Sequence, residues 1–394
     1  MMDSIYVGLT GLTAFSDGLK TISNNVANMN TVGYKSRQSE FADLFYRFQV
    51  GSDSGDNATP YSDGSGVTAT AAHMNLKQGD FRTTGNDLDV GVDGHGLLVL
   101  QGDKGEIYTR AGQFEIDSDG YLVAKNSSNR VLFLSGGGLT PVNVNDFRSN
   151  PAKATASVAF SDTLSVNDST FSVNATVFDS LGANHTLVTK FTNNNTVTAG
   201  SWLVEISESG TALKTGEIRF DGTGKVVTGF DSIAFSYKPS ALVNNTTLTL
   251  DFSKATALSA SASSLKVASQ NGFTAGSLTK TSFDTDGTIV FSYSNGQTTK
   301  GSRLALASFN FESALEPLGN NEFINSSGQE RVLGAPSEGE FGDIKGGGIE
   351  ASNVDLAGQF SELIITQRGY QGSSQVISAA NEMIQQLFDM HSKR

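Results

Sequence analysis

The sequence predicts a mixed α and β, multidomain fold. Helices at the two ends of the chain are expected to pair as a coiled-coil-like inner layer, with two nested, mostly antiparallel β domains of sandwich or barrel type outside them. Three observations support this prediction. Apolar residues recur every seven positions near both termini, the middle alternates apolar and polar residues between glycine-rich turns, and 394 residues exceed one small core.

The first helix is predicted within residues 1–30, with Asp3 or Ser4 as its N-cap. Four apolar residues lie seven positions apart and a fifth occupies the intermediate position, which is the geometry of helices that pack at a shallow angle. The predicted seam residues are Ile5, Leu9, Leu12, Leu19 and Val26.

The last helix is predicted within residues 352–394, where Ser352 and Asp355 have the spacing of a capping box. The predicted seam residues are Leu356, Phe360, Leu363, Tyr370, Ile377, Ile384 and Phe388. One interpretation is that each helix packs on its own globular core. We favour the other, in which the two helices pair, because the seams alone bury too little apolar surface to offset the entropy of ordering them. Such helices are expected to need further partners.

The middle of the chain is predicted to be β structure in nested order. After a connector at residues 31–70, residues 71–147 and 271–351 are expected to form an inner β domain, and residues 148–270 an inserted outer β domain. The glycine run at 346–348 is interpreted as a hinge into the last helix.

Composition excludes several classes of function. The net charge is −13, from 27 basic and 40 acidic residues, which argues against nucleic-acid binding. The absence of cysteine excludes disulfides and thiolate sites. No apolar run is long enough to insert in a membrane, and no cleaved signal peptide is recognisable.

No residue pattern indicates catalysis. The four histidines lie far apart, and the stretches "DSDG" (117–120) and "DTDG" (284–287) fit β-turns better than calcium loops, because glycine comes too early. We therefore predict no catalytic, cofactor-binding or metal site, and no enzyme activity.

Three stretches carry a specific resemblance. "ISNNVANMNTVGYKS" (22–36), "GGGIEASNVDLAGQFSELIITQRGYQGSSQVISAANEMIQQLF" (346–388) and "TGNDLDVGVDGHGLLVLQ" with "YTRAGQFEIDSDGYLV" (84–123) resemble, in the expected order, the signatures of bacterial flagellar rod and hook proteins. Within that family "VFDSLGANHTLVTKF" (177–191) is similar to the outer domain of the hook members. Gly369 and Gly372 depart from the commoner alanines, which affects local helix rigidity.

The resemblance implies an exported structural subunit of the extracellular hook, which polymerises with itself into a curved tube that transmits torque from rod to filament. Its other implied partners are the distal rod protein, the hook cap, the hook–filament junction proteins and the type III export apparatus. The alternatives are a straight rod-type axial protein and, in another class, a secreted β-rich enzyme or adhesin.

The same resemblance marks the loop after the first helix as an assembly site shared with neighbouring subunits. Asparagine and glycine there suit left-handed backbone and a helix end, and Tyr34 and Lys35 suit a crevice between subunits. The predicted loop residues are Asn24, Asn25, Ala27, Asn28, Asn30, Thr31, Gly33, Tyr34 and Lys35. Bending is expected in residues 36–70 and in polar contacts of 148–270, because packed interiors resist strain.

Overall fold

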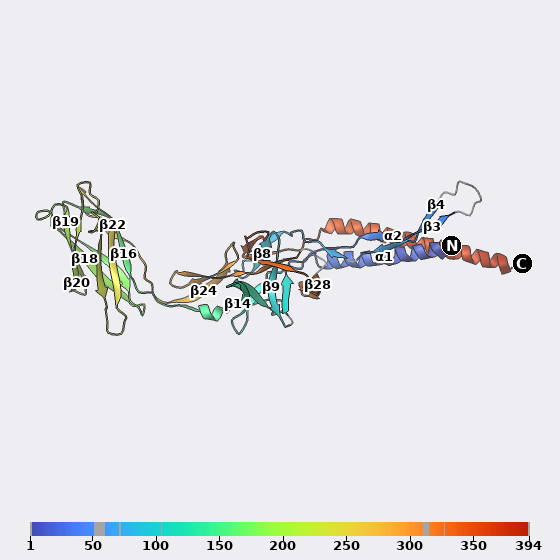
Figure 1. The fold of residues 1–394 in the computed structure, drawn as a ribbon, viewed down its shortest axis with the longest axis horizontal. Coiled ribbons are helices and arrows are strands. Elements are labelled where there is room, and N and C mark those ends of the chain that lie inside the picture. The colour runs from blue at the N-terminus through green and yellow to red at the C-terminus, as the bar shows by residue number, and fades with distance from the viewer. Residues whose placement is uncertain are drawn as a thin grey trace. The chain divides into compact units, whose positions relative to one another are not determined.

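A computed structural model describes residues 2–50, 60–70, 72–103, 105–309, 315–326 and 328–392. The chain divides into two compact units (Figure 1). The first unit comprises Met1–Asn145, Thr281–Val290 and Lys300–Arg394, and the second comprises Asp146–Lys280 and Phe291–Thr299.

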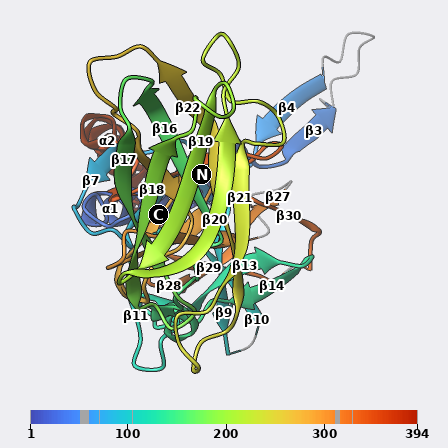
Figure 2. The same cartoon turned by 90° about the vertical axis from the view of Figure 1, so that its left-hand side faces the viewer.

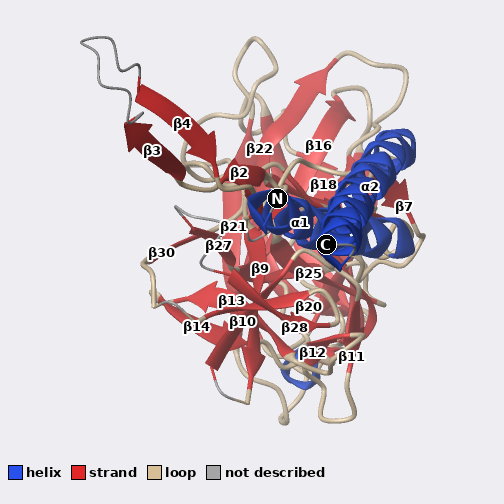
Figure 3. Ribbon diagram, turned by 90° about the vertical axis from the view of Figure 1, so that its right-hand side faces the viewer, coloured by secondary structure: helices blue, strands red, loops and turns tan. Residues whose placement is uncertain are grey.

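Two long helices of the first unit pack side by side (Figure 3). They are α1 (Met2–Ala27) and α2 (Leu356–Ser392), and they run in opposite directions, since the end of α1 lies beside the start of α2. Paired terminal helices together with several sheets confirm the predicted fold class.

The predicted helix caps are wrong in detail. The helix α1 begins at Met2, so neither Asp3 nor Ser4 precedes it. At α2 the N-cap is Asp355, whose Oδ1 accepts a hydrogen bond from the Ala357 amide at 3.1 Å. The expected Ser352–Asp355 capping box does not form, because the helix starts three residues later than that motif requires.

A large antiparallel sheet around the strand β9, with two separate two-stranded sheets, forms the β part of the first unit. Residues Leu97–Leu100 of β9 are buried throughout, and β9 pairs with β10, β13 and β27. The strands of this part are β7 (Phe81–Thr83), β8 (Val90–Asp93), β9 (Leu97–Gly102), β10 (Gly105–Thr109), β11 (Phe114–Ile116), β12 (Leu122–Ala124), β13 (Arg130–Ser135), β14 (Gly138–Pro141), β27 (Leu306–Phe309), β28 (Leu315–Gly319), β29 (Glu322–Asn325), β30 (Arg331–Gly334), β31 (Asp343–Gly346) and β32 (Gly348–Glu350).

Segments far apart in sequence share these sheets. The strand β31 pairs with β8, and β32 pairs with β7, so the chain just before α2 lies against residues 81–93. The glycine run at 346–348 therefore joins two paired strands, with Gly347 in the turn between them, and its interpretation as a hinge is wrong. The stretch 316–330 contains most of the hairpin β28–β29.

The connector after α1 is a ladder of short strand pairs. β1 (Arg37–Gln38) pairs with β6 (His73–Met74), β2 (Phe41–Asp43) with β5 (Val67–Ala69), and β3 (Tyr46–Val50) with β4 (Pro60–Gly64). The ladder packs on α1, where the rings of Phe15 and Phe41 lie 5.3 Å apart. Within residues 36–70, where bending is expected, residues 51–59 lie outside the described part of the chain, and only the backbone is described for 46–50 and 60–63.

The second unit contains two four-stranded sheets around one apolar core (Figure 2). One sheet has the order β21-β22-β16-β23 and the other β17-β18-β19-β20. The core includes Phe160, Phe191, Trp202 and Phe252, each at most 2% exposed. Buried and exposed positions alternate along strands such as β19 and β21, as in a β-sandwich. The strands are β15 (Ser149–Asn150), β16 (Ser157–Ser165), β17 (Thr170–Phe178), β18 (Asn184–Asn193), β19 (Ser201–Glu208), β20 (Thr211–Arg219), β21 (Ser232–Tyr237), β22 (Thr246–Leu258) and β23 (Lys266–Gln270).

A short 3₁₀ helix (Val144–Phe147) and three strands carry the chain between the units. The strands are β24 (Gly276–Phe283), β25 (Thr288–Tyr293) and β26 (Thr298–Leu304). The sequences "DSDG" and "DTDG" are turns, as predicted: the Gly120 amide donates to Asp117 O at 3.1 Å and the Gly287 amide to Asp284 O at 3.0 Å.

Candidate assembly site: the helix pair and its buried junction

Small residues let α1 and α2 approach closely. A Cβ atom added to Gly8 would lie 2.9 Å from Ile377 Cγ1, and one added to Gly11 would lie 2.7 Å from Ser373 Oγ. On α2, a Cβ at Gly369 would collide with the ring of Phe15. These distances are shorter than van der Waals contact. The two backbones can therefore approach closely because glycine has no side chain, and the contact does not consist of large apolar side chains packed into holes.

The helices keep one register along their shared length. In four close pairs the two residue numbers add to 384, and in the pair Gly8–Ile377 they add to 385, so Met2 lies about level with Glu382. The ten residues 383–392 of α2 therefore extend beyond α1 (Figure 1). The pairs are Gly11–Ser373, Phe15–Gly369, Gly18–Thr366 and Asn25–Gln359.

The predicted seam residues are only partly at this contact. Ile377 contacts α1. The other residues of α2 that face α1 are Gln359, Thr366, Ser373 and Ala380, each one position before the predicted seam positions that include Phe360 and Phe388. The half-buried seam residues are Ile5, Leu12, Leu19, Val26, Leu363, Ile377 and Ile384. The exposed ones are Leu9, Leu356, Phe360, Tyr370 and Phe388.

The loop after α1 closes the helix with its own side chains. Asn28 Nδ2 donates to Asn24 O at 2.9 Å, and Thr31 Oγ1 donates to Asn28 Oδ1 at 3.0 Å. The Asn24 carbonyl therefore accepts two hydrogen bonds from Asn28, since the Asn28 amide also donates to it at 3.1 Å. Ala27 and Asn30 are exposed, as is Asn24.

Asn25, which is 1% exposed, fastens the loop to both helices. Its Nδ2 donates to Arg37 O at 2.7 Å and to Gln359 Oε1 at 2.9 Å. Its Oδ1 accepts hydrogen bonds from the Arg37 amide at 2.9 Å and from the Tyr34 hydroxyl at 3.2 Å. Asn25 therefore connects α1, α2 and the connector within one chain.

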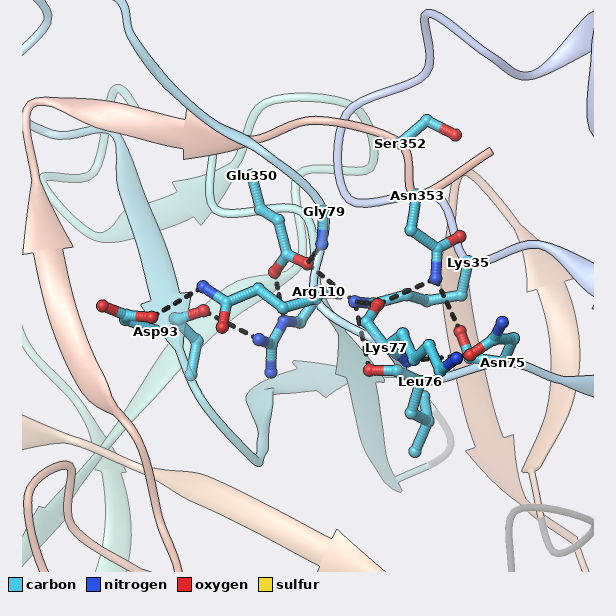
Figure 4. Close-up of polar contacts among 12 residues, drawn as sticks. Lys35, Asn75, Leu76, Lys77, Gly79, Asp93, Arg110, Glu350, Ser352 and Asn353 are labelled. Carbon is cyan, nitrogen blue, oxygen red and sulfur yellow. Dashed lines mark hydrogen bonds and ion pairs between the residues drawn. The ribbon is translucent and has the colours of Figure 1, made fainter. Parts of the chain in front are cut away.

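A buried ionic cluster, which we call the junction, lies where both helices join the β strands (Figure 4). Glu350 accepts hydrogen bonds from Lys35 Nζ at 2.7 Å, Arg110 Nε at 2.5 Å and the Gly79 amide at 2.8 Å. The three charged side chains are 1–4% exposed. Burial of this kind is tolerated only when each charge is paired and hydrogen-bonded.

Backbone carbonyls complete the junction, which holds two cations and one anion. Lys35 Nζ also donates to Lys77 O at 2.8 Å, and the Arg110 guanidinium donates to the carbonyls of Val92, Gly94 and Gly96. These acceptors occupy donors that Glu350 does not reach.

The junction shifts the pKa values of its members. Burial lowers the pKa of Lys35 from its usual value, against the opposing pull of the Glu350 carboxylate. Burial acts to raise the pKa of Glu350, but the Arg110 charge and the hydrogen bonds from Lys35 and Gly79 outweigh it, so that pKa is lowered. Glu350 is therefore ionised at neutral pH.

Two further contacts tie the chain ends together at the junction. The Gly33 amide donates to Glu350 O at 2.8 Å, and Gly33 has φ of +65° with Arg110 backbone where a Cβ would lie. Asn353 Oδ1 accepts from the Ser36 amide at 2.7 Å, while its Nδ2 donates to Asn75 O and Lys77 O, both at 2.8 Å.

The junction corrects one expectation and adds residues that sequence reasoning missed. Lys35 was expected between subunits, but its side chain is enclosed within its own chain. Arg110, Glu350 and Asn353 were not singled out, although "YTRAG" and "IEASN" place charged or amide residues within apolar, small-residue stretches. A lone charge in a stretch that reads as buried was the available signal.

Other kinds of site find no support in the part of the chain that is described. No group of three or more His, Asp or Glu side chains there is arranged to hold a metal ion. Neither described helix has the length and hydropathy to cross a membrane.

Three family models match the chain. "Flagella basal body rod protein" matches residues 5–35, "Flagellar basal body protein FlaE D2 domain" matches residues 143–273, and "Flagellar basal body rod FlgEFG protein C-terminal" matches residues 345–390. The first model covers most of α1 and the loop after it as far as Lys35. The third covers β32 with Glu350 and most of α2.

Curated relatives match nearly end to end. Flagellar hook protein FlgE of Rhizobium meliloti is 30% identical, covering 97% of each chain. The chain belongs to the flagellar hook protein family. As a hook-family member it is a structural subunit of the flagellar hook, and so part of the flagellum.

Other hook proteins are similar over the same span. FlgE of Escherichia coli is 28% identical over 97% of this chain and 98% of that one, and FlgE of Borreliella burgdorferi is 27% identical over 98% and 99%. A crystal structure of Helicobacter pylori flagellar hook protein FlgE2 overlaps with a TM-score of 0.48 at 15% identity, covering 67% of this chain and 99% of that one. At that level the structural overlap carries no weight of its own.

Proposed function

We propose that copies of this chain polymerise through their terminal helices into a curved, flexible tube that transmits torque from rod to filament. The observation that carries the proposal is the end of α2 beyond α1. There Leu387, Phe388 and Met390 are 48%, 70% and 69% exposed. Exposed apolar side chains grouped on a helix mark an interaction surface.

The predicted seam and loop residues supply further surface for this assembly. Leu9, Phe360 and Tyr370 remain exposed after α1 and α2 have paired, so a neighbouring copy is free to bury them. Asn24, Ala27 and Asn30 in the loop after α1 are exposed as well, and we include them in the contact between copies.

The proposed domain roles follow the predicted order. Residues 1–30 with 352–394 form the inner helical layer, 31–70 the connector, 71–147 with 271–351 the inner β domain, and 148–270 the outer β domain. Bending takes place where contacts are polar and slide at little cost, on the outer domain. Packed β interiors resist the same strain.

The proposed setting is outside the cell, reached through the flagellar type III apparatus without a cleaved signal peptide. The distal rod protein, the hook cap and the hook–filament junction proteins are the proposed neighbours at the ends of the tube. No nucleic acid, cofactor or catalytic step has a part in this function.

Electron microscopy of the purified full-length chain under polymerising conditions tests the proposal. Curved tubes are expected. Straight, rigid tubes would instead identify a rod-type axial protein, and a protein that stays monomeric at every concentration would contradict polymerisation itself.

A further inference from the structure

A second apolar line runs along α2, apart from the one that faces α1. All of its residues are exposed, and their steps of three, four or seven positions are those of a helix that packs at a shallow angle. None of them is charged. We call this set the second line; it consists of Ile365, Gly372, Val376, Ala379, Met383, Leu387 and Met390.

Helix geometry separates this line from the existing contact. At 3.6 residues per turn, it lies roughly 100° around α2 from the residues that face α1. It is nevertheless continuous with that contact, because Gly369, which packs under Phe15, lies at its edge. At Gly372, a Cβ would meet nothing within 4 Å, so the surface is open to a close neighbour.

A complementary surface exists on α1. The predicted seam of this helix, which we call the α1 stripe, is Ile5, Leu9, Leu12, Leu19 and Val26, and it is half-buried or exposed. It lies about 90° from the residues of α1 that face α2, again at 3.6 residues per turn. Because the two helices are antiparallel, the stripe and the second line lie on opposite sides of the pair.

The length of the second line and the directions of the two helices also fit this contact. The helix α1 has 26 residues, and the second line extends from Ile365 to Met390, the same length. The α1 stripe and the second line are different surfaces on opposite sides of the helix pair. A contact between them is head-to-tail, so every added copy still presents one free surface to the next copy. Helical symmetry preserves direction along the axis, so the α1 of a neighbour also runs antiparallel to this α2.

We propose that the second line of α2 receives the α1 stripe of a second copy of this chain. This proposal rests on the proposed polymerisation and names the surfaces that perform it. Each helix pair then contacts one neighbour through α1 and another through α2, so that the pairs form a continuous wall.

Cross-linking in assembled tubes tests the contact, since the natural chain contains no cysteine. One chain carries Leu9→Cys, and a second carries one cysteine on the second line. The two are mixed, polymerised and treated with a short thiol cross-linker. Successive positions in the panel are seven or eight residues apart, which is about 10–12 Å along the helix. Whatever the shift of the neighbour's α1 along the second line, one panel position should therefore lie close to Leu9. The panel is Ile365→Cys, Gly372→Cys, Ala379→Cys and Leu387→Cys.

The matched control is Gln371→Cys, which is equally exposed but lies on another side of α2. At least one panel position is expected to give tenfold more mixed dimer than this control. If tubes form and no panel position exceeds Gln371→Cys, the second line does not receive α1, while polymerisation stands. If panel chains cross-link only to each other, the occupant is a second α2 and the proposal is wrong. If the unmodified chain makes no tubes, the proposed function itself fails.

Discussion

Removing the charge of Glu350 is the most direct test of the junction. Glu350→Gln keeps the size of the side chain but leaves Lys35 and Arg110 buried, at 1% and 4% exposure, without an anion. Breaking a buried ion pair by removing one partner costs about 3–5 kcal/mol. Glutamine still offers one acceptor oxygen, so we expect the lower part of that range, about 3 kcal/mol, lost from the first unit alone.

The assay is urea unfolding of unpolymerised protein at neutral pH, followed by two signals. Trp202, the one tryptophan of the chain, lies in the core of the second unit, so its fluorescence reports that unit. Far-ultraviolet circular dichroism reports both units. With a urea dependence of ~1–3 kcal/mol per molar, the midpoint of the first unit should fall by about 1 M or more, and the fluorescence midpoint should stay unchanged.

The chain offers a matched control in the same unit. Glu338 pairs with Arg303 at the surface, where its side chain is 61% exposed. Exposed pairs contribute about 1 kcal/mol or less, so Glu338→Gln should shift the midpoint little. Equal shifts for the two variants would show that Glu350 does not neutralise buried cations, and a shift in tryptophan fluorescence would show that the effect is not local.

Four further outcomes are expected. Because the pKa of Glu350 is lowered on folding, its contribution to stability is complete above the unfolded pKa of about 4.3 and is lost as the pH falls through the lower folded pKa. The stability of the first unit should therefore fall less steeply with decreasing pH in Glu350→Gln than in the natural chain. Equal pH dependence in the two proteins would refute the lowered pKa of Glu350. Gly369→Ala should lower the melting temperature of the first unit in the unpolymerised chain because Phe15 blocks the added methyl, whereas Gly372→Ala, which meets nothing within 4 Å in the single chain, should raise it through helix propensity of up to ~1 kcal/mol; the opposite order would contradict the helix register. A chain ending at Glu382 should form no tubes by electron microscopy while keeping its tryptophan unfolding midpoint, and normal tubes would mean that residues 383–392 are dispensable. A chain lacking residues 148–270 should assemble into tubes of altered curvature, and normally curved tubes would exclude the outer domain as the sliding surface.

The sequence predicted the helix pair but misplaced its contact by one residue on α2. The seven-residue repeat of large apolar residues is real, yet the closest approach is made by Gly8, Gly11 and Gly369. Pattern reasoning assigns large apolar residues to a seam and treats glycine as a helix breaker. It therefore cannot anticipate a contact in which glycine is used for close approach of two backbones.

The junction was beyond sequence reasoning for a different reason. Lys35, Arg110 and Glu350 are separated by up to 315 positions, so although a lone charge in an apolar stretch signals burial, nothing in the sequence shows which of them pair. Long-range backbone contacts bring them together: β7 pairs with β32, which places Glu350 opposite Phe81, and the Gly33 amide donates to Glu350 O. The connector strands were missed because pairs of two or three residues, such as β1 with β6, carry no period that a sequence window detects.

The junction also determines which parts of the first unit move together. The end of α1 is fixed through Lys35, the start of α2 through Asn353, and both bond to the loop at residues 75–79. Rotating either helix against the β strands would expose or unpair a buried charge, at a cost of several kcal/mol. The helix pair and the β strands of this unit therefore transmit force as one body. In the proposed tube we therefore expect bending at contacts between copies, where exposed pairs exchange at about 1 kcal/mol or less.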